Sequence, residues 1–73
     1  MTKRIQGTVK TWLEHIGVGH VAPANNHNLD IFVGRTHVPD RDGARKLVPG
    51  ERVEFELRES QYALRAVNLT FPL

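Results

Sequence analysis

The stretch "PGERVEFELRES", residues 49–60, carries the clearest structural signal in this 73-residue chain. After a Pro-Gly turn, Val53, Phe55 and Leu57 alternate with arginines and glutamates. Apolar residues that recur with a period of two are typical of a β-strand with one buried face. The stretch therefore predicts a strand and indicates a fold built from sheet.

Four further runs of the same kind surround this strand, each bounded by turn residues. They are "RIQGTVKTWL" (4–13), "GVGHVAP" (17–23), "DIFVG" (30–34) and "QYALRAVNLTF" (61–71). In the last run Ala66 and Val67 would both face inward, which indicates a β-bulge. Residues 36–50 hold two prolines and two glycines and predict a long connection, with one helical turn over residues 44–47.

Five short strands in a chain of this length cannot form a two-sheet sandwich with a useful core. Closing the sheet into a barrel removes its edges and encloses its apolar face. The long connection after the third strand suits a barrel of the OB type. We therefore expect an all-β, five-stranded antiparallel Greek-key barrel that comprises residues 1–73 as a single domain.

The amino-acid composition excludes some kinds of binding site and indicates where in the cell the protein acts. The absence of cysteine excludes structural disulfides and Cys-based zinc sites. A net charge of +2 is compatible with a nucleic-acid partner but does not identify one. No apolar run approaches the ~20 residues that cross a bilayer, and no signal-peptide pattern opens the chain. We expect a cytoplasmic protein without a membrane partner.

Strand parity gathers a set of side chains on the outside of the barrel. If Ile31 and Val33 point inward, Phe32 must point outward, and the same argument applies to the two preceding strands. The expected outer face displays Lys10, Trp12, Val18, His20 and Phe32, with Arg35 at its end. Gly17 and Gly19 would permit sharp curvature of the sheet beneath it.

Exposed aromatic rings beside cations favour a platform for unpaired bases, because bases stack on rings while Lys and Arg follow the phosphates. The alternative is that the connection over residues 36–50 covers Trp12 and Phe32 as a secondary core. The basic cluster within that connection is balanced by neighbouring aspartates and indicates a solvated loop. Its members are Arg41, Arg45 and Lys46.

Catalysis and metal binding have little support in the sequence. Four histidines occur without a His-x-x-x-His pair, on positions that do not converge as a zinc site requires. No nucleophile and base can be assembled into a triad. We therefore expect a protein without enzymatic activity, metal or cofactor. The four histidines are His15, His20, His27 and His37.

The sequence resembles the bacterial cold-shock proteins over essentially its whole length. "GTVKTW" is similar to the family's opening G-x-V-K-W-F, "IGVGHV" to its first ribonucleoprotein motif K-G-F-G-F-I, and "IFVGR" to its second, V-F-V-H-F. "DGARKLVPGERVEF" and "AVNLT" follow the family's remaining patterns at the same spacing. The resemblance implies an OB-fold barrel that binds single-stranded RNA or DNA, as an RNA chaperone does.

The resemblance is closer for the fold than for the ligand-contacting positions. Lys10 and Phe32 coincide with such positions, and Trp12 falls where the family has Phe. Tyr62, near a family Lys before the fifth strand, is expected to restore one ring. Elsewhere family side chains are replaced by Thr11 (for Trp), Ile16 (for Lys), Val18 and His20 (for Phe), Gly34 (for His) and Arg35 (for Phe).

These replacements lead to a specific functional prediction. Trp12 and Phe32 would stack bases, His20 and Tyr62 would supplement them, and the cations Lys10 and Arg35 would contact phosphates. Because several stacking surfaces are lost, we expect weaker and more salt-dependent binding than in the family. The apolar replacements at positions 16 and 18 leave a second hypothesis open, namely a protein-interaction module or a homodimer.

Overall fold

A computed structural model of the chain describes residues 4–61 and 63–72, in which five strands and one short 3-10 turn occur. The elements are β1 (Arg4–Leu13), β2 (Val18–Pro23), β3 (Ile31–Gly34), the turn η1 (Arg35–His37), β4 (Arg52–Glu59) and β5 (Leu64–Thr70). No helix in this part of the chain is long and apolar enough to span a bilayer.

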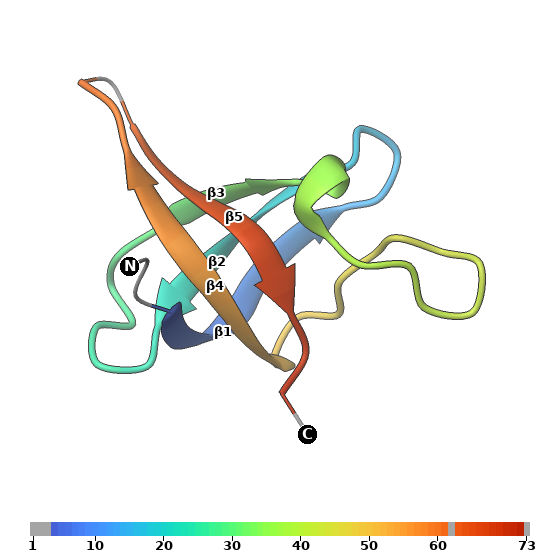
Figure 1. Ribbon diagram of the computed structural model, residues 1–73, viewed down its shortest axis with the longest axis horizontal. Helices are drawn as coiled ribbons and strands as arrows, with labels where there is room; N and C mark the ends of the chain where they lie inside the picture. The colour runs from blue at the N-terminus through green and yellow to red at the C-terminus, as the bar shows by residue number, and fades with distance from the viewer. Residues whose placement is uncertain (1–3, 62, 73) are drawn as a thin grey trace.

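The strands close into a barrel in the order β1-β2-β3-β5-β4, with β4 returning to pair with β1 (Figure 1). The neighbouring pairs are antiparallel except β3 and β5, which run parallel where Phe32 meets Arg65. A closed ring with an odd number of strands cannot alternate direction throughout. The predicted all-β, five-stranded OB-type barrel is confirmed, with the correction that one closing pair is parallel.

Alternating side chains from every strand fill the barrel. Val53 and Phe55 of β4, Val21 of β2, and Ile31 and Val33 of β3 are all fully buried. Each such side chain contributes about 1.5–3 kcal/mol through removal from water. Since these inner positions are fixed, the residues between them are held on the outer face of the same strands.

The expected bulge in β5 is present. Glu54 pairs with Thr70 and Glu56 with Val67, so β5 carries one extra residue over this interval. Asn68, within the bulge, adopts a left-handed backbone conformation with φ of 51°. The extra residue lets both Ala66 and Val67 turn inward, where they are 0% and 3% exposed.

The connection between β3 and β4 does not contain the helical turn predicted at residues 44–47. The only described turn of helix is η1, at the start of the connection. Leu47 is buried in the core, which anchors the segment in a non-helical path. The Arg41 guanidinium donates to the Lys46 carbonyl over 3.1 Å, and this contact bridges the loop.

Arg41 belongs to the fold rather than to a solvated basic patch. Its two Nη atoms donate to the two carboxylate oxygens of Glu51 over 2.7 and 3.0 Å, and its Cζ lies 3.7 Å from the centre of the Phe71 ring. Burial alone would raise the pKa of Glu51. The hydrogen bonds from Arg41 and from the Val48 N–H, together with the Arg41 charge, lower this pKa below its ordinary value.

Candidate nucleic-acid interface

A β-bulge at Lys10 reverses the parity of the last residues of β1. Val9 is paired with Val21, whereas Thr11 is paired with His20, so Lys10 is the extra residue. Side chains directly opposite one another share a face of the sheet. Thr11 therefore lies outside with His20, and the next residue turns back toward the barrel interior.

Trp12 is that next residue, and its predicted place on the outer face was wrong. It is paired with Gly19 and packs against the core cluster, half-buried. Its indole Nε1 donates to the Glu14 carboxylate over 2.7 Å. A Cβ at Gly19 would lie 2.8 Å from the Trp12 ring and 2.3 Å from the Thr11 carbonyl, so this glycine is required by close approach.

Phe32 and His20 form the aromatic part of the outer face. They are directly opposite in the β2–β3 register, half-buried, with ring centroids 6.4 Å apart and an interplanar angle of 80°. The His20 Nδ1 lies 3.1 Å from the Thr11 hydroxyl, which fixes the imidazole edge. The structure thus brings together two of the three rings that the sequence placed here; their role in binding stays a prediction.

Toward the β1–β2 turn, the same face is apolar. Val18 lies on the outer face, paired with both Leu13 and Gly34. Leu13 is 46% exposed and Ile16, in the turn, is 59% exposed. Gly17 in this turn has a φ of 71°, a conformation that glycine adopts without strain. This apolar end of the face is bordered by the Arg35–Glu14 ion pair, since the Arg35 side chain lies against Gly17.

The two cations expected to contact phosphates are both engaged with carboxylates. The Lys10 ammonium pairs with Asp30, and the hydrogen bond and charge of Lys10 lower the pKa of that carboxyl. The Arg35 guanidinium donates to the Glu14 carbonyl and, over 3.2 Å, to the Glu14 carboxylate. A phosphate would have to compete with these internal acids. Tyr62 lies outside the described residues.

Sequence reasoning missed Arg65, which completes the row of side chains across the face. Arg65 is paired with Phe32 across β3 and β5, and its Cζ lies 5.7 Å from the Phe32 ring centre. Strand parity beside the buried Ala66 would have placed Arg65 outside, but only the barrel closure puts it beside Phe32. We refer to Thr11, His20, Phe32 and Arg65 as the cross-strand row.

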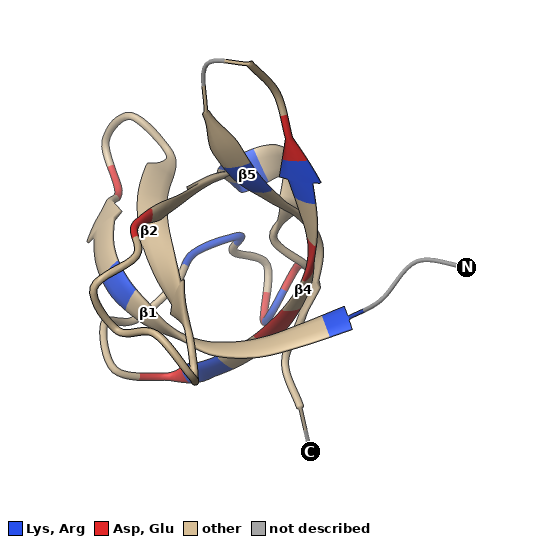
Figure 2. Ribbon diagram, turned by 90° about the vertical axis from the view of Figure 1, so that its left-hand side faces the viewer, with Lys and Arg blue, Asp and Glu red and all other residues tan. Residues whose placement is uncertain are grey.

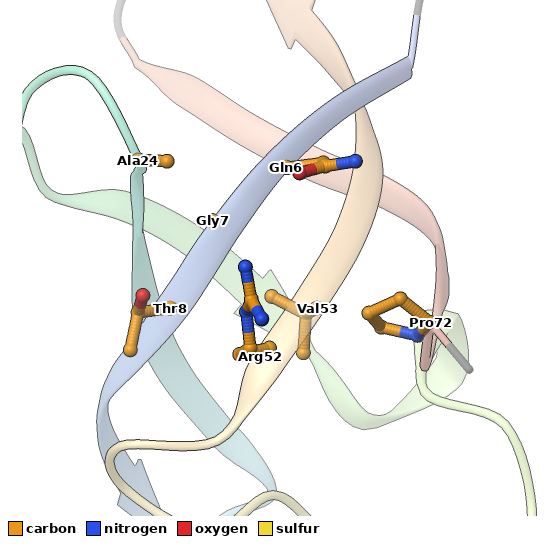
Figure 3. Close-up of a pocket in the computed structure, with 7 residues that line it drawn as sticks. All are labelled: Gln6, Gly7, Thr8, Ala24, Arg52, Val53 and Pro72. Atoms are coloured by element: carbon orange, nitrogen blue, oxygen red, sulfur yellow. The ribbon is translucent and has the colours of Figure 1, made fainter.

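On the opposite side of the barrel, β1 and β4 border a hollow, and the Arg52 side chain lies between the two strands (Figure 3). Among the described residues, no group of three or more histidine or acidic side chains is placed to hold a metal. The cross-strand row, by contrast, gathers two rings and one guanidinium group on one face of the sheet.

Comparison with known proteins agrees with this geometry. A profile of the "'Cold-shock' DNA-binding domain" family matches residues 5–72. The chain is 36% identical over 67 residues to the Cold shock-like protein CspC of Shigella flexneri, covering 92% of this chain and 94% of that protein. It is also 36% identical over 64 residues to the Major cold shock protein of Micrococcus luteus, covering 88% and 92% of the two chains. The resemblance noted in the sequence is confirmed, and the chain belongs to the cold-shock DNA-binding domain family.

Proposed function

We propose that this barrel binds single-stranded RNA or DNA along the cross-strand row, without catalysis. The observation that carries the proposal is the pair of half-exposed rings, His20 and Phe32, directly opposite on adjacent strands of a cold-shock-family barrel. Each base stacked on such a ring contributes about 1–3 kcal/mol, and stacking requires an unpaired base. The row therefore favours single strands over duplexes.

The interface is expected to bind more weakly than a fully aromatic one. Thr11, Val18 and Gly34 lie on the face at positions without a ring, and Trp12 is turned toward the core. When an interface has fewer stacking surfaces, more of the binding free energy comes from contacts to the phosphates of the ligand. The contribution of phosphate contacts falls steeply as salt is raised. We therefore propose weak binding with a marked salt dependence.

A second candidate function rests on the apolar end of the face. Leu13 and Ile16 are exposed and lie next to Val18, which together form a patch suited to a protein surface or to a second copy of the chain. This patch adjoins the cross-strand row but contributes no ring or cation to it.

Titration of fluorescein-labelled single-stranded thymidine and uridine octanucleotides, followed by anisotropy, tests the proposal. We expect saturable binding that weakens as salt is raised and that a duplex of the same length does not reproduce. A constant anisotropy at low salt with excess protein would reject single-strand binding. Sedimentation of the protein alone, compared with a Leu13→Ser/Ile16→Ser variant, would then examine self-association through the apolar patch.

A further inference from the structure

We infer that the phosphates of the bound strand are contacted by an arginine pair, Arg58 and Arg65, that extends the cross-strand row onto β4. This inference rests on the proposed function and names the cations of that site. It places phosphate contacts on β5 and β4, whereas the sequence predicted them at Lys10 on β1 and at Arg35 after β3.

The first observation is one of register. Arg58 of β4 is directly opposite Arg65 of β5, and Arg65 in turn is paired with Phe32. Both arginines are exposed, and Lys and Arg positions lie side by side on β4 and β5 in Figure 2. Neighbouring strands are about 4.8 Å apart, so Phe32, Arg65 and Arg58 follow one another across three adjacent strands.

The second observation concerns ion pairs. Among the residues that the structure describes, the ion pairs are Arg4–Glu56, Lys10–Asp30, Arg35–Glu14 and Arg41–Glu51. Neither Arg58 nor Arg65 belongs to one. Glu56, the acid nearest to Arg58 on the same face of β4, is paired with Arg4 over 3.5 Å. The Arg58–Arg65 pair therefore has no carboxylate partner among these residues.

The third observation is the cost of this arrangement to the fold. Like charges directly opposite on adjacent strands destabilise a sheet. Local choices that oppose stability concentrate at functional sites. An anion bound between the two guanidinium groups would relieve the repulsion, and arginine is well suited to phosphate because its planar fork donates two hydrogen bonds at once.

The experiment measures the affinity of a labelled thymidine octanucleotide at several salt concentrations for Arg58→Gln, Arg65→Gln and the double variant. Arg52→Gln is the matched control. Arg52 is an exposed arginine on the same strand β4, but it is paired with Thr8 of β1 and lies between β1 and β4 (Figure 3). Each lost contact should reduce the slope of log K against log salt by about 0.7 and the affinity by about eightfold at ~50 mM salt.

The melting temperatures of the variants distinguish a role of Arg58 and Arg65 in binding from a role in folding. Arg58→Gln removes like-charge repulsion and should leave the melting temperature unchanged or raised while affinity falls. If Arg65→Gln unfolds the barrel, Arg65→Lys keeps the charge and should retain the salt slope of the parent protein.

The possible results are distinct. Absence of binding by the parent protein would overturn both the proposed function and this inference. Binding by the parent protein with Arg58→Gln and Arg65→Gln equal to Arg52→Gln would overturn only the inference. Tighter binding by Arg65→Gln would show that the guanidinium covers the Phe32 ring, which would also overturn it.

Discussion

The β1 side and the β5 side of the outer face differ in whether their aromatic rings and cations have an acidic partner within the protein. On the β1 side, Trp12 is turned toward the core and held by Glu14, while Lys10 pairs with Asp30. On the β5 side, Phe32 remains on the outer face beside Arg65, which has no carboxylate partner among the described residues. An aromatic ring and a cation are therefore engaged in internal contacts with acids on the β1 side. On the β5 side, a ring and a cation have no such contact with an acid among the described residues.

Glu14 explains much of this difference. Its carboxylate accepts from the Trp12 indole over 2.7 Å and from the Arg35 guanidinium over 3.2 Å. A single carboxylate thus binds both the Trp12 ring and the Arg35 cation, which the sequence predicted to contact the nucleic acid. Composition alone does not show which cations are paired with a carboxylate in the folded protein.

The largest expected effect is on the Trp12 side and on stability. Trp12→Ala should lower the free energy of unfolding by about 2–3 kcal/mol, since the half-buried ring packs against the core and Gly19 leaves space for it. Urea denaturation followed by circular dichroism measures this, because the variant lacks its single tryptophan. Trp12→Phe is the control and should recover most of the loss. A stable Trp12→Ala barrel with impaired binding would contradict the comparison.

Phe32→Ala should weaken binding and leave stability nearly unchanged, the reverse of Trp12→Ala. Loss of one stacking surface is expected to weaken oligonucleotide binding by about five- to thirtyfold, equivalent to ~1–2 kcal/mol. The free energy of unfolding should change little, because the ring lies outside the barrel wall. Anisotropy titration and urea denaturation of the same variant provide the two values, and Phe32→Tyr should preserve both. Unfolding of Phe32→Ala would assign the ring to the core.

The Arg41–Glu51 pair provides a comparison with Arg65, because Arg41 is an arginine that stabilises the fold through a carboxylate partner. The pKa of Glu51 is lowered below its ordinary 4.5, so the carboxylate stabilises the folded state above pH 4.5 and this contribution is lost as pH falls through the lowered value. Glu51→Gln should cost about 1 kcal/mol at neutral pH through the weakened hydrogen bonds.

Denaturation curves between neutral and acidic pH check this expectation. The difference in unfolding free energy between the parent protein and Glu51→Gln should shrink below pH 4.5, while oligonucleotide affinity at neutral pH stays unchanged. A difference that is constant with pH would show that the charge of Glu51 contributes nothing to the loop.

The smallest expected effect concerns the carboxylate beside Lys10. Asp30→Asn removes the partner of this ammonium, which is then free to contact a phosphate. Because exposed ion pairs are weak, affinity should rise by only about two- to fivefold. Asp42→Asn makes the same charge change in the β3–β4 connection and should raise affinity less. Equal gains in both variants would mean that only net charge matters.

Much of the fold follows directly from the sequence. The period of two in residues 52–58 predicts β4, and the competing inward residues Ala66 and Val67 predict the bulge in β5. Both signals depend only on neighbouring residues. The helical turn predicted at 44–47 failed because Leu47 is drawn into the core and Arg41 binds the Lys46 carbonyl, contacts that local preference does not reveal.

The candidate site depends more on pairing between strands. Phe32 and His20 could be placed outside because their strands keep regular parity. Trp12 could not, since the bulge at Lys10 becomes apparent only when β1 is paired with β2. Arg65 was missed because its position next to Phe32 follows from barrel closure.

The most direct test of the cross-strand row is a heteronuclear NMR titration of the labelled protein with a thymidine octanucleotide at low salt. We predict progressive shifts of the signals of His20, Phe32 and Arg65, with little change at Gln6 and Arg52 on the opposite side of the barrel. Shifts centred on residues 6 and 52, or no shifts with excess oligonucleotide, would contradict binding along the row.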